Sequence, residues 1–193
     1  MRMRASFIIL LLSFIFNSWH SSAQTVALLS KTSPNVDFTF NTINEYVNGI
    51  TLSNVLALNV DAELTQWDLY VGATTSIAGE WDATTYYSNN GEAPDLNMIE
   101  IRFRNQSNTP LTSGFFPLTD IATPTDIIGD RLNAPDAAIS CDDVTPVGTN
   151  MAGDYLSRPG CYKFNVDLRI TPGLSYRAGL YTLRIDFILA PDL

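Results

Sequence analysis

The sequence predicts an all-β protein, an immunoglobulin-like antiparallel β-sandwich with one disulfide. The first observation is that apolar and polar residues alternate along several segments with the two-residue period of a β-strand. The second is that turns containing glycine, asparagine and proline separate these segments. The third is that no segment keeps a helical period over three turns. Two antiparallel sheets packed face to face satisfy these patterns, and a closed barrel is the alternative.

Six segments show the strand pattern, in chain order 36–40 (VDFTF), 51–60 (TLSNVLALNV), 66–72 (QWDLYVG), 99–103, 162–170 and 181–189. Each of them has one apolar side, which is typical of antiparallel sheets with one solvated face. Trp67 alternates in phase with Leu69 and Val71. We therefore expect Trp67 in the core between the sheets, the alternative being an exposed platform for a ligand.

The last two segments alternate most clearly. The apolar side of segment 162–170 is formed by Tyr162, Phe164, Val166, Leu168 and Ile170. The apolar side of segment 181–189 is formed by Tyr181, Leu183, Ile185, Phe187 and Leu189.

The turn signals of the chain are Asn48-Gly49, Asn89-Asn90-Gly91, Ser113-Gly114, Pro172-Gly173 and Ala178-Gly179. The region 126–132 is expected to form a turn or one turn of helix.

Residues 1–23 have the pattern of a secretory signal peptide. Arg2 and Arg4 precede a short apolar stretch at 7–16, and the small residues 21–23 precede Gln24, where we expect cleavage. The alternative is an uncleaved anchor, but polar residues from Asn17 onward end the apolar run well short of the roughly 20 residues that span a bilayer. We therefore predict an exported protein of the periplasm, cell surface or extracellular space, with one domain at 24–193 and no membrane span.

The single histidine, His20, lies in this leader, so the processed chain would contain none. This argues against histidine-dependent hydrolases and against most transition-metal sites. The formal net charge of the whole chain is −9, which disfavours nucleic acid and anionic membrane surfaces as partners. We expect no cofactor and no enzymatic activity, although a pair of carboxylates for glycoside hydrolysis needs no histidine.

Two cysteines remain after cleavage, Cys141 and Cys161. An even number of cysteines in an exported chain predicts a disulfide, and two reactive thiols are the alternative. The surrounding region 120–154 is acidic, with Asp126, Asp130, Asp136, Asp142, Asp143 and Asp154 among prolines. Because no calcium-loop spacing appears there, we expect a solvated acidic loop and no metal, with calcium as the alternative.

The segment 76–97 departs from the strand pattern. It places Trp81, Tyr86 and Tyr87 among glycine, asparagine, serine and threonine. This composition is typical of recognition loops, so the three aromatic residues are candidate contacts for a ligand such as a glycan. We expect their rings to pack onto the edge of the sheets, with ligand contact as the alternative.

Near the C-terminal end, Pro172, Tyr176, Gly179 and Tyr181 precede the alternating run LRIDFIL. This arrangement resembles the last two strands of bacterial fimbrial and spore-coat-U-type subunits. The resemblance implies a structural or adhesive subunit of a cell surface, with other protein subunits as partners. It also implies assembly by donation of an extended N-terminal strand, for which residues 24–40 are the candidate. The alternative function is a secreted carbohydrate-binding β-sandwich module that uses Trp81, Tyr86 and Tyr87.

Overall fold

The computed structural model of this 193-residue protein describes residues 26–30, 35–62, 67–105, 114–127, 153–156 and 162–191. Across these ranges the chain forms antiparallel strand ladders and one short α-helix, which confirms the predicted all-β class. The predicted signal peptide at 1–23 and both cysteines of the predicted disulfide, Cys141 and Cys161, lie outside the described residues.

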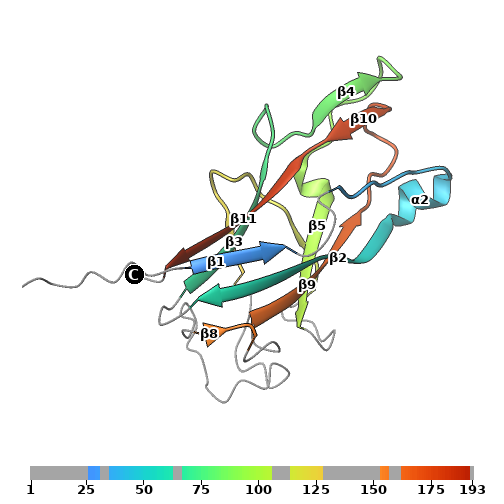
Figure 1. Ribbon diagram of the computed structural model, residues 1–193. Coiled ribbons are helices and arrows are strands. Elements are labelled where there is room, and N and C mark those ends of the chain that lie inside the picture. The colour runs from blue at the N-terminus through green and yellow to red at the C-terminus, as the bar shows by residue number, and fades with distance from the viewer. Residues whose placement is uncertain are drawn as a thin grey trace, which may run out of the picture.

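The larger sheet has the strand order β1-β2-β9-β5-β6 (Figure 1). Its strands are β1 (Val26–Ser30), β2 (Ile50–Ala62), β9 (Lys163–Ile170), β5 (Ile99–Asn105) and β6 (Phe116–Pro117). The two-residue strand β8 (Gly153–Asp154) pairs with the end of β2. β9 pairs with β2 on one side and β5 on the other, and both come from much earlier in the chain, so long-range pairing fixes the centre of this sheet.

The second sheet has the order β11-β3-β7. It consists of β11 (Arg184–Pro191), β3 (Trp67–Thr74) and β7 (Thr125–Asp126). Beyond it, β4 (Asp82–Tyr86) pairs with β10 (Gly179–Thr182) in a two-stranded ladder. We call this ladder and its connecting turn residues 87–95 and 174–178 the arm. Figure 1 shows the arm projecting from the end of the second sheet.

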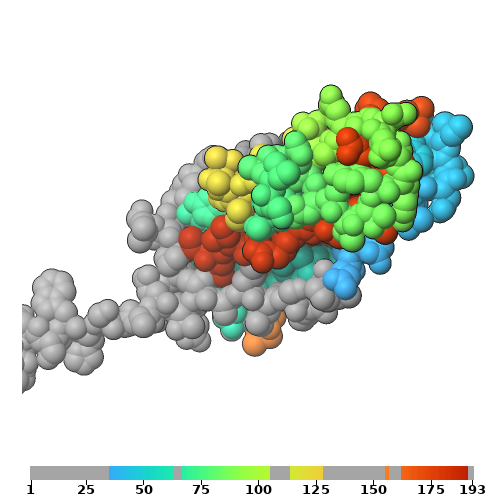
Figure 2. Space-filling model, turned by 90° about the horizontal axis from the view of Figure 1, so that it is seen from above, coloured from blue at the N-terminus to red at the C-terminus, as the bar shows by residue number. Residues whose placement is uncertain are grey.

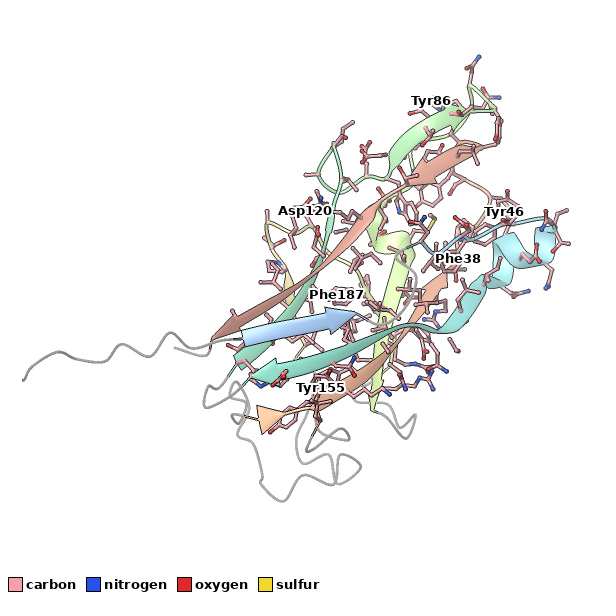
Figure 3. The ribbon with its side chains drawn as sticks, in the orientation of Figure 1. Phe38, Tyr46, Tyr86, Asp120, Tyr155 and Phe187 are labelled. Atoms are coloured by element: carbon pink, nitrogen blue, oxygen red, sulfur yellow. The ribbon has the colours of Figure 1, made fainter. Side chains whose placement is uncertain are left out.

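One hydrophobic cluster joins the two larger sheets. Trp67 of β3 lies 6.3 Å from Phe164 of β9, measured between ring centroids. Phe103 of β5 lies 6.2 Å from Phe187 of β11, which Figure 3 labels between the sheets. Trp67 is only 1% exposed, so the prediction that it is a core residue is confirmed.

The strand prediction for 162–170 is confirmed, since Tyr162 and the four apolar residues in phase with it are all buried. Asp167 of the opposite face is buried as well, which the alternation does not predict. The segment 181–189 forms two strands instead of one: β10 pairs with β4, β11 pairs with β3, and Leu183 lies between them. The apolar side of β11 nevertheless packs against the core through Ile185, Phe187 and Leu189.

Two further expectations are corrected. The segment 36–40 is extended, with Val36, Phe38 and Phe40 half-buried against the core, but within the described residues it pairs with no strand. Asp126 does not begin a helical turn, because it pairs with Tyr70 in the β3–β7 ladder. Residues 128–132 of that region lie outside the described part.

A six-residue helix, α2 (Ile43–Asn48), precedes β2. Its start carries a capping box, in which the Glu45 backbone N–H donates to Thr42 Oγ1 at 3.2 Å and the Thr42 N–H donates to Glu45 Oε2 at 2.9 Å. Gly49 ends the helix with a φ of +77°, and its N–H donates to the Glu45 carbonyl oxygen at 2.8 Å. The predicted turn at Asn48-Gly49 is thus the end of a helix too short to show a period.

Candidate functional site

The N-terminal strand β1 is the first candidate site, because it is the one strand formed by the described part of the predicted donor segment 24–40. It pairs antiparallel with β2 in the register Val26↔Ala62 to Ser30↔Leu58. β1 also lies beside β11, the edge strand of the second sheet (Figure 1). The N-terminal strand therefore occupies the side of the molecule at which the edges of the two sheets meet.

The part of β2 that β1 covers belongs to the core. Leu58 is 1% exposed, and Val60 and Ala62 are fully buried. Further along the predicted donor segment, Val36 and Phe38 pack against the core. The described part of the donor segment is thus attached to the body of the protein, through strand pairing at 26–30 and through side-chain packing at 36–40.

The arm is the second candidate site, because it carries two of the three predicted ligand contacts. Tyr86 is 48% exposed and Tyr87 is 67% exposed. The Tyr86 ring makes an edge contact with Tyr181 across the ladder at 6.2 Å, and the Arg177 guanidinium lies 4.6 Å from its centroid. Figure 3 shows Tyr86 on the arm, away from the core. One side of the Tyr86 ring is thus occupied by the cation, whereas Tyr87 is open to solvent.

Hydrogen bonds between distant segments hold the arm together. The Arg177 N–H donates to the Glu92 carbonyl oxygen at 2.8 Å, and the Tyr176 hydroxyl donates to Asp95 Oδ2 at 3.1 Å. Burial and this contact with the carboxylate raise the pKa of Tyr176. Gly91 has a φ of +98°, and a Cβ there would lie 2.6 Å from the Arg177 nitrogen. Figure 2 shows the green and red segments that form the arm packed together at one end of the molecule.

The third predicted contact, Trp81, is not part of an exposed platform. Its ring is half-buried and packs against the core, and its Nε1–H donates to the Asp95 carbonyl oxygen at 3.1 Å. Trp81 therefore fastens the arm to the body, which agrees with the packing expectation. Tyr86 and Tyr87 are exposed on the arm, whereas Trp81 is packed against the core and does not lie on the same exposed surface.

An ion cluster on the outer face of the larger sheet was not predicted. Asp167 of β9 lies fully buried between two arginines of β5, with Arg102 Nη2 at 2.6 Å and Arg104 Nη2 at 2.5 Å from its carboxylate oxygens. The Asn54 N–H donates to Asp167 Oδ1 at 2.9 Å from an irregularity in β2. Burial raises the pKa of Asp167, but these hydrogen bonds and the Arg104 charge outweigh it and hold the pKa below its usual range.

Phe115 lies between two cations on the same face. The guanidinium carbons of Arg102 and Arg169 each lie 4.4 Å from its ring centroid. Arg169 also pairs with Glu100 at 2.6 Å. Since the charges in this cluster are paired with one another, the cluster stabilises the pairing of β5 with β9. The alternating arginines at 102 and 104 were the only signal of it in the sequence.

No group of three or more histidine, cysteine, aspartate or glutamate residues gathers as a metal site within the described part of the chain. Of the acidic region 120–154, Asp130, Asp136, Asp142 and Asp143 lie outside that part. Among the described helices, none is both long and apolar enough to cross a membrane. No protein-family model matches the chain, and no curated protein matches it in sequence.

Proposed function

We propose that this protein is an exported, non-enzymatic β-sandwich of the immunoglobulin-like kind that serves as a structural or adhesive subunit of a cell surface. The observation that supports this proposal best is the position of β1. A short N-terminal strand that forms the outermost described strand of a sheet can leave that place and be replaced by the same strand of another copy. The resemblance of the C-terminal strands to fimbrial and coat subunits agrees with such an assembly.

The physical basis of the exchange is that β1 and its replacement make the same bonds. Five residue pairs join β1 to β2, and an identical strand from a neighbour would restore each of them. Removal of β1 would leave the backbone groups of β2 between Leu58 and Ala62 without strand partners on that side, next to a buried core. Unpaired strand edges recruit other strands, so the vacated edge is the expected site of subunit contact.

The test compares the processed chain, residues 24–193, with a variant that lacks 24–40, by light scattering. We expect polymers or a partner complex that disappear in the deletion variant. A synthetic peptide of residues 24–40 should then bind the variant and restore its folding, whereas a peptide of the same composition in scrambled order should not. The proposal is wrong if the processed chain stays monomeric and residues 24–29 can be deleted without loss of stability.

The second candidate function is a secreted carbohydrate-binding module, favoured by the exposure of Tyr86 and Tyr87 on the arm. Open aromatic rings can stack on the apolar face of a sugar. Substitution of Tyr87 by alanine should then abolish retention on a glycan array without unfolding the protein. If both Tyr87→Ala and Tyr86→Ala are still retained on the array, the tyrosines are not the sugar contact.

A further inference from the structure

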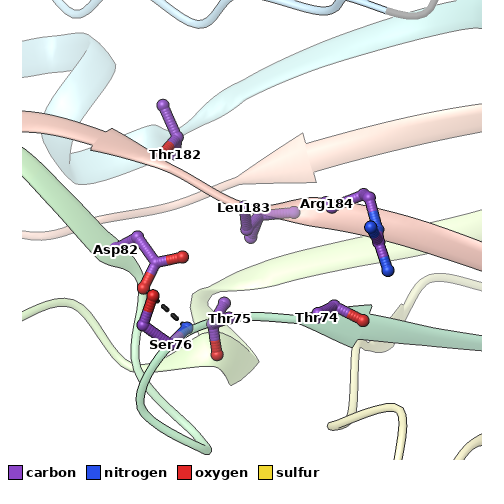
Figure 4. A pocket seen from close by; sticks show the side chains of 7 residues that line it. All are labelled: Thr74, Thr75, Ser76, Asp82, Thr182, Leu183 and Arg184. Carbon is purple, nitrogen blue, oxygen red and sulfur yellow. Dashed lines mark hydrogen bonds between the residues drawn. The ribbon is translucent and has the colours of Figure 1, made fainter.

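A depression lies where the arm joins the body (Figure 4). It is open to solvent, has a volume of about 390 Å³, and is lined by Thr74, Thr75, Ser76, Asp82, Thr182, Leu183 and Arg184. The strands explain its place. Arg184 and Thr74 are the last pair of the β11–β3 ladder, and Thr182 and Asp82 are the last pair of the arm. The depression therefore forms where two ladders separate.

Hydrogen bonds fix the wall of this depression on the side of the body. The Thr74 hydroxyl donates to Asp186 Oδ2 at 2.6 Å, and Arg184 Nε lies 2.9 Å from Asp186 Oδ1. Asp186 thus holds the stem of the Arg184 guanidinium in place. Arg184 bonds to Asp186 through Nε, and its two terminal nitrogens make no hydrogen bond to other described residues, so they can donate to a ligand.

The wall on the side of the arm is fixed in the same way. The Ser76 backbone N–H donates to Asp82 Oδ1 at 2.8 Å, as Figure 4 shows, and the Thr75 hydroxyl donates to the Ile77 carbonyl oxygen at 2.8 Å. The second oxygen of Asp82 and the hydroxyls of Ser76 and Thr182 make no hydrogen bond to other described residues. One acceptor and two groups that both donate and accept therefore line the depression together with Arg184.

These groups define the chemistry of a ligand. Asp82 and Asp186 outnumber Arg184 around the depression, and the whole chain carries a formal net charge of −9, which disfavours an anion. One carboxylate among neutral hydroxyls falls short of the six to eight oxygens that calcium takes. A neutral molecule with many hydroxyl groups can use every free donor and acceptor here.

We propose that this depression binds one or two units of a neutral saccharide. Asp82 accepts hydrogen bonds from the sugar hydroxyls, Arg184 and Thr182 donate to sugar oxygens, and Leu183 contacts the apolar face of the ring. The site is distinct from the exposed tyrosines, and it does not depend on strand exchange.

The test uses the full exported chain and a panel of neutral oligosaccharides, with galacturonic acid and glucosamine as charged comparisons. Binding is followed by the backbone amide shifts of residues 74–76, 82 and 182–184 and by calorimetry. The key variants are Asp82→Asn, which keeps an oxygen to accept from Ser76, and Arg184→Gln. Thr84→Ala, at an exposed position of β4 outside the depression, is the matched control on the arm, and Tyr87→Ala reports any binding at the tyrosines.

We expect neutral oligosaccharides to shift these amides. Each key variant should weaken binding at least tenfold while thermal unfolding is unchanged, and Thr84→Ala should bind normally. Three outcomes would overturn the proposal: no neutral member of the panel binds, only the charged sugars bind, or binding is lost in Tyr87→Ala and retained in Asp82→Asn. The last result would assign the sugar to the tyrosines. These measurements do not report the oligomeric state, so a negative result would overturn the saccharide site without bearing on the subunit proposal, which light scattering tests.

Discussion

Asp167 is the residue whose charge we expect to matter most for stability. Substitution by asparagine keeps the shape of the side chain but leaves Arg102 and Arg104 without their shared anion. Loss of one partner from a buried ion pair costs about 3 kcal/mol of unfolding free energy. Urea unfolding of Asp167→Asn against the unchanged protein measures this loss.

The control for that substitution is Glu100→Gln. Glu100 also pairs with an arginine of the neighbouring strand, but the Glu100 and Arg169 side chains are 25% and 38% exposed. We expect a loss below about 1 kcal/mol, as is usual for ion pairs in contact with solvent. Equal losses for the two variants would contradict a special role for the buried carboxylate.

The same carboxylate predicts a pH dependence. The pKa of Asp167 is lower in the folded than in the unfolded protein, so the unfolded chain takes up a proton first as the pH falls. The ionised Asp167 carboxylate stabilises the folded protein fully above about pH 4, which is the usual pKa of an aspartate in an unfolded chain. This stabilisation is lost as the pH falls through the lower pKa that Asp167 has in the folded protein. Melting temperatures between about pH 6 and pH 2 should therefore fall less steeply for Asp167→Asn than for the unchanged chain. Parallel curves would show that Asp167 does not titrate in this way.

At the scale of elements, Gly49 determines how α2 meets β2. Gly49 and Gly79 both have positive φ, at +77° and +84°, but only Gly49 is crowded. A Cβ at Gly49 would lie 2.6 Å from the Ile170 carbonyl oxygen and would also meet the Thr171 hydroxyl, whereas a Cβ at Gly79 would meet nothing within 4 Å. Gly49 also has a ψ of 174°, outside the left-handed helical region, so a side chain there meets both backbone strain and a clash.

We expect Gly79→Ala to lower the unfolding free energy by about 1 kcal/mol, which is the cost of the left-handed conformation alone. Gly49→Ala should cost about 3 kcal/mol, because the turn must also move away from β9. Chemical denaturation of both variants tests this difference. Equal losses would show that the contact with β9 yields without cost.

At the scale of the whole molecule, the N-terminal segment determines whether the core is closed. Phe38 is half-buried against the core, although its segment pairs with no described strand. Phe38→Ala should lower the unfolding free energy by about 2 kcal/mol, less than for a fully buried phenylalanine. Thr39→Ala, at an exposed neighbouring position, is the control and should change it by less than about 0.5 kcal/mol. A negligible effect of Phe38→Ala would mean that the segment does not seal the core in solution.

Much of the fold could be predicted from local pattern. A two-residue period requires only that one face of each strand is buried, so the inward residues of β9 and the core position of Trp67 followed from neighbours in the chain. The exposed tyrosines of the arm also stood out, since aromatic residues among glycine and asparagine are a compositional signal. The division of the last segment into β10 and β11 could not be predicted, because both strands share one alternation and differ only in their partners.

By itself, the sequence determined the all-β class and the inward face of the strands, because these depend on the order of apolar and polar residues along the chain. Only the tertiary structure decided which charges meet. Asp167 is 65 residues from Arg102 and 63 from Arg104, and the pairing of β5 with β9 brings them together. The depression at the arm depends likewise on where two ladders part. Strand pairing is a long-range choice made by the packing of the whole core, and alternation within one strand does not encode it.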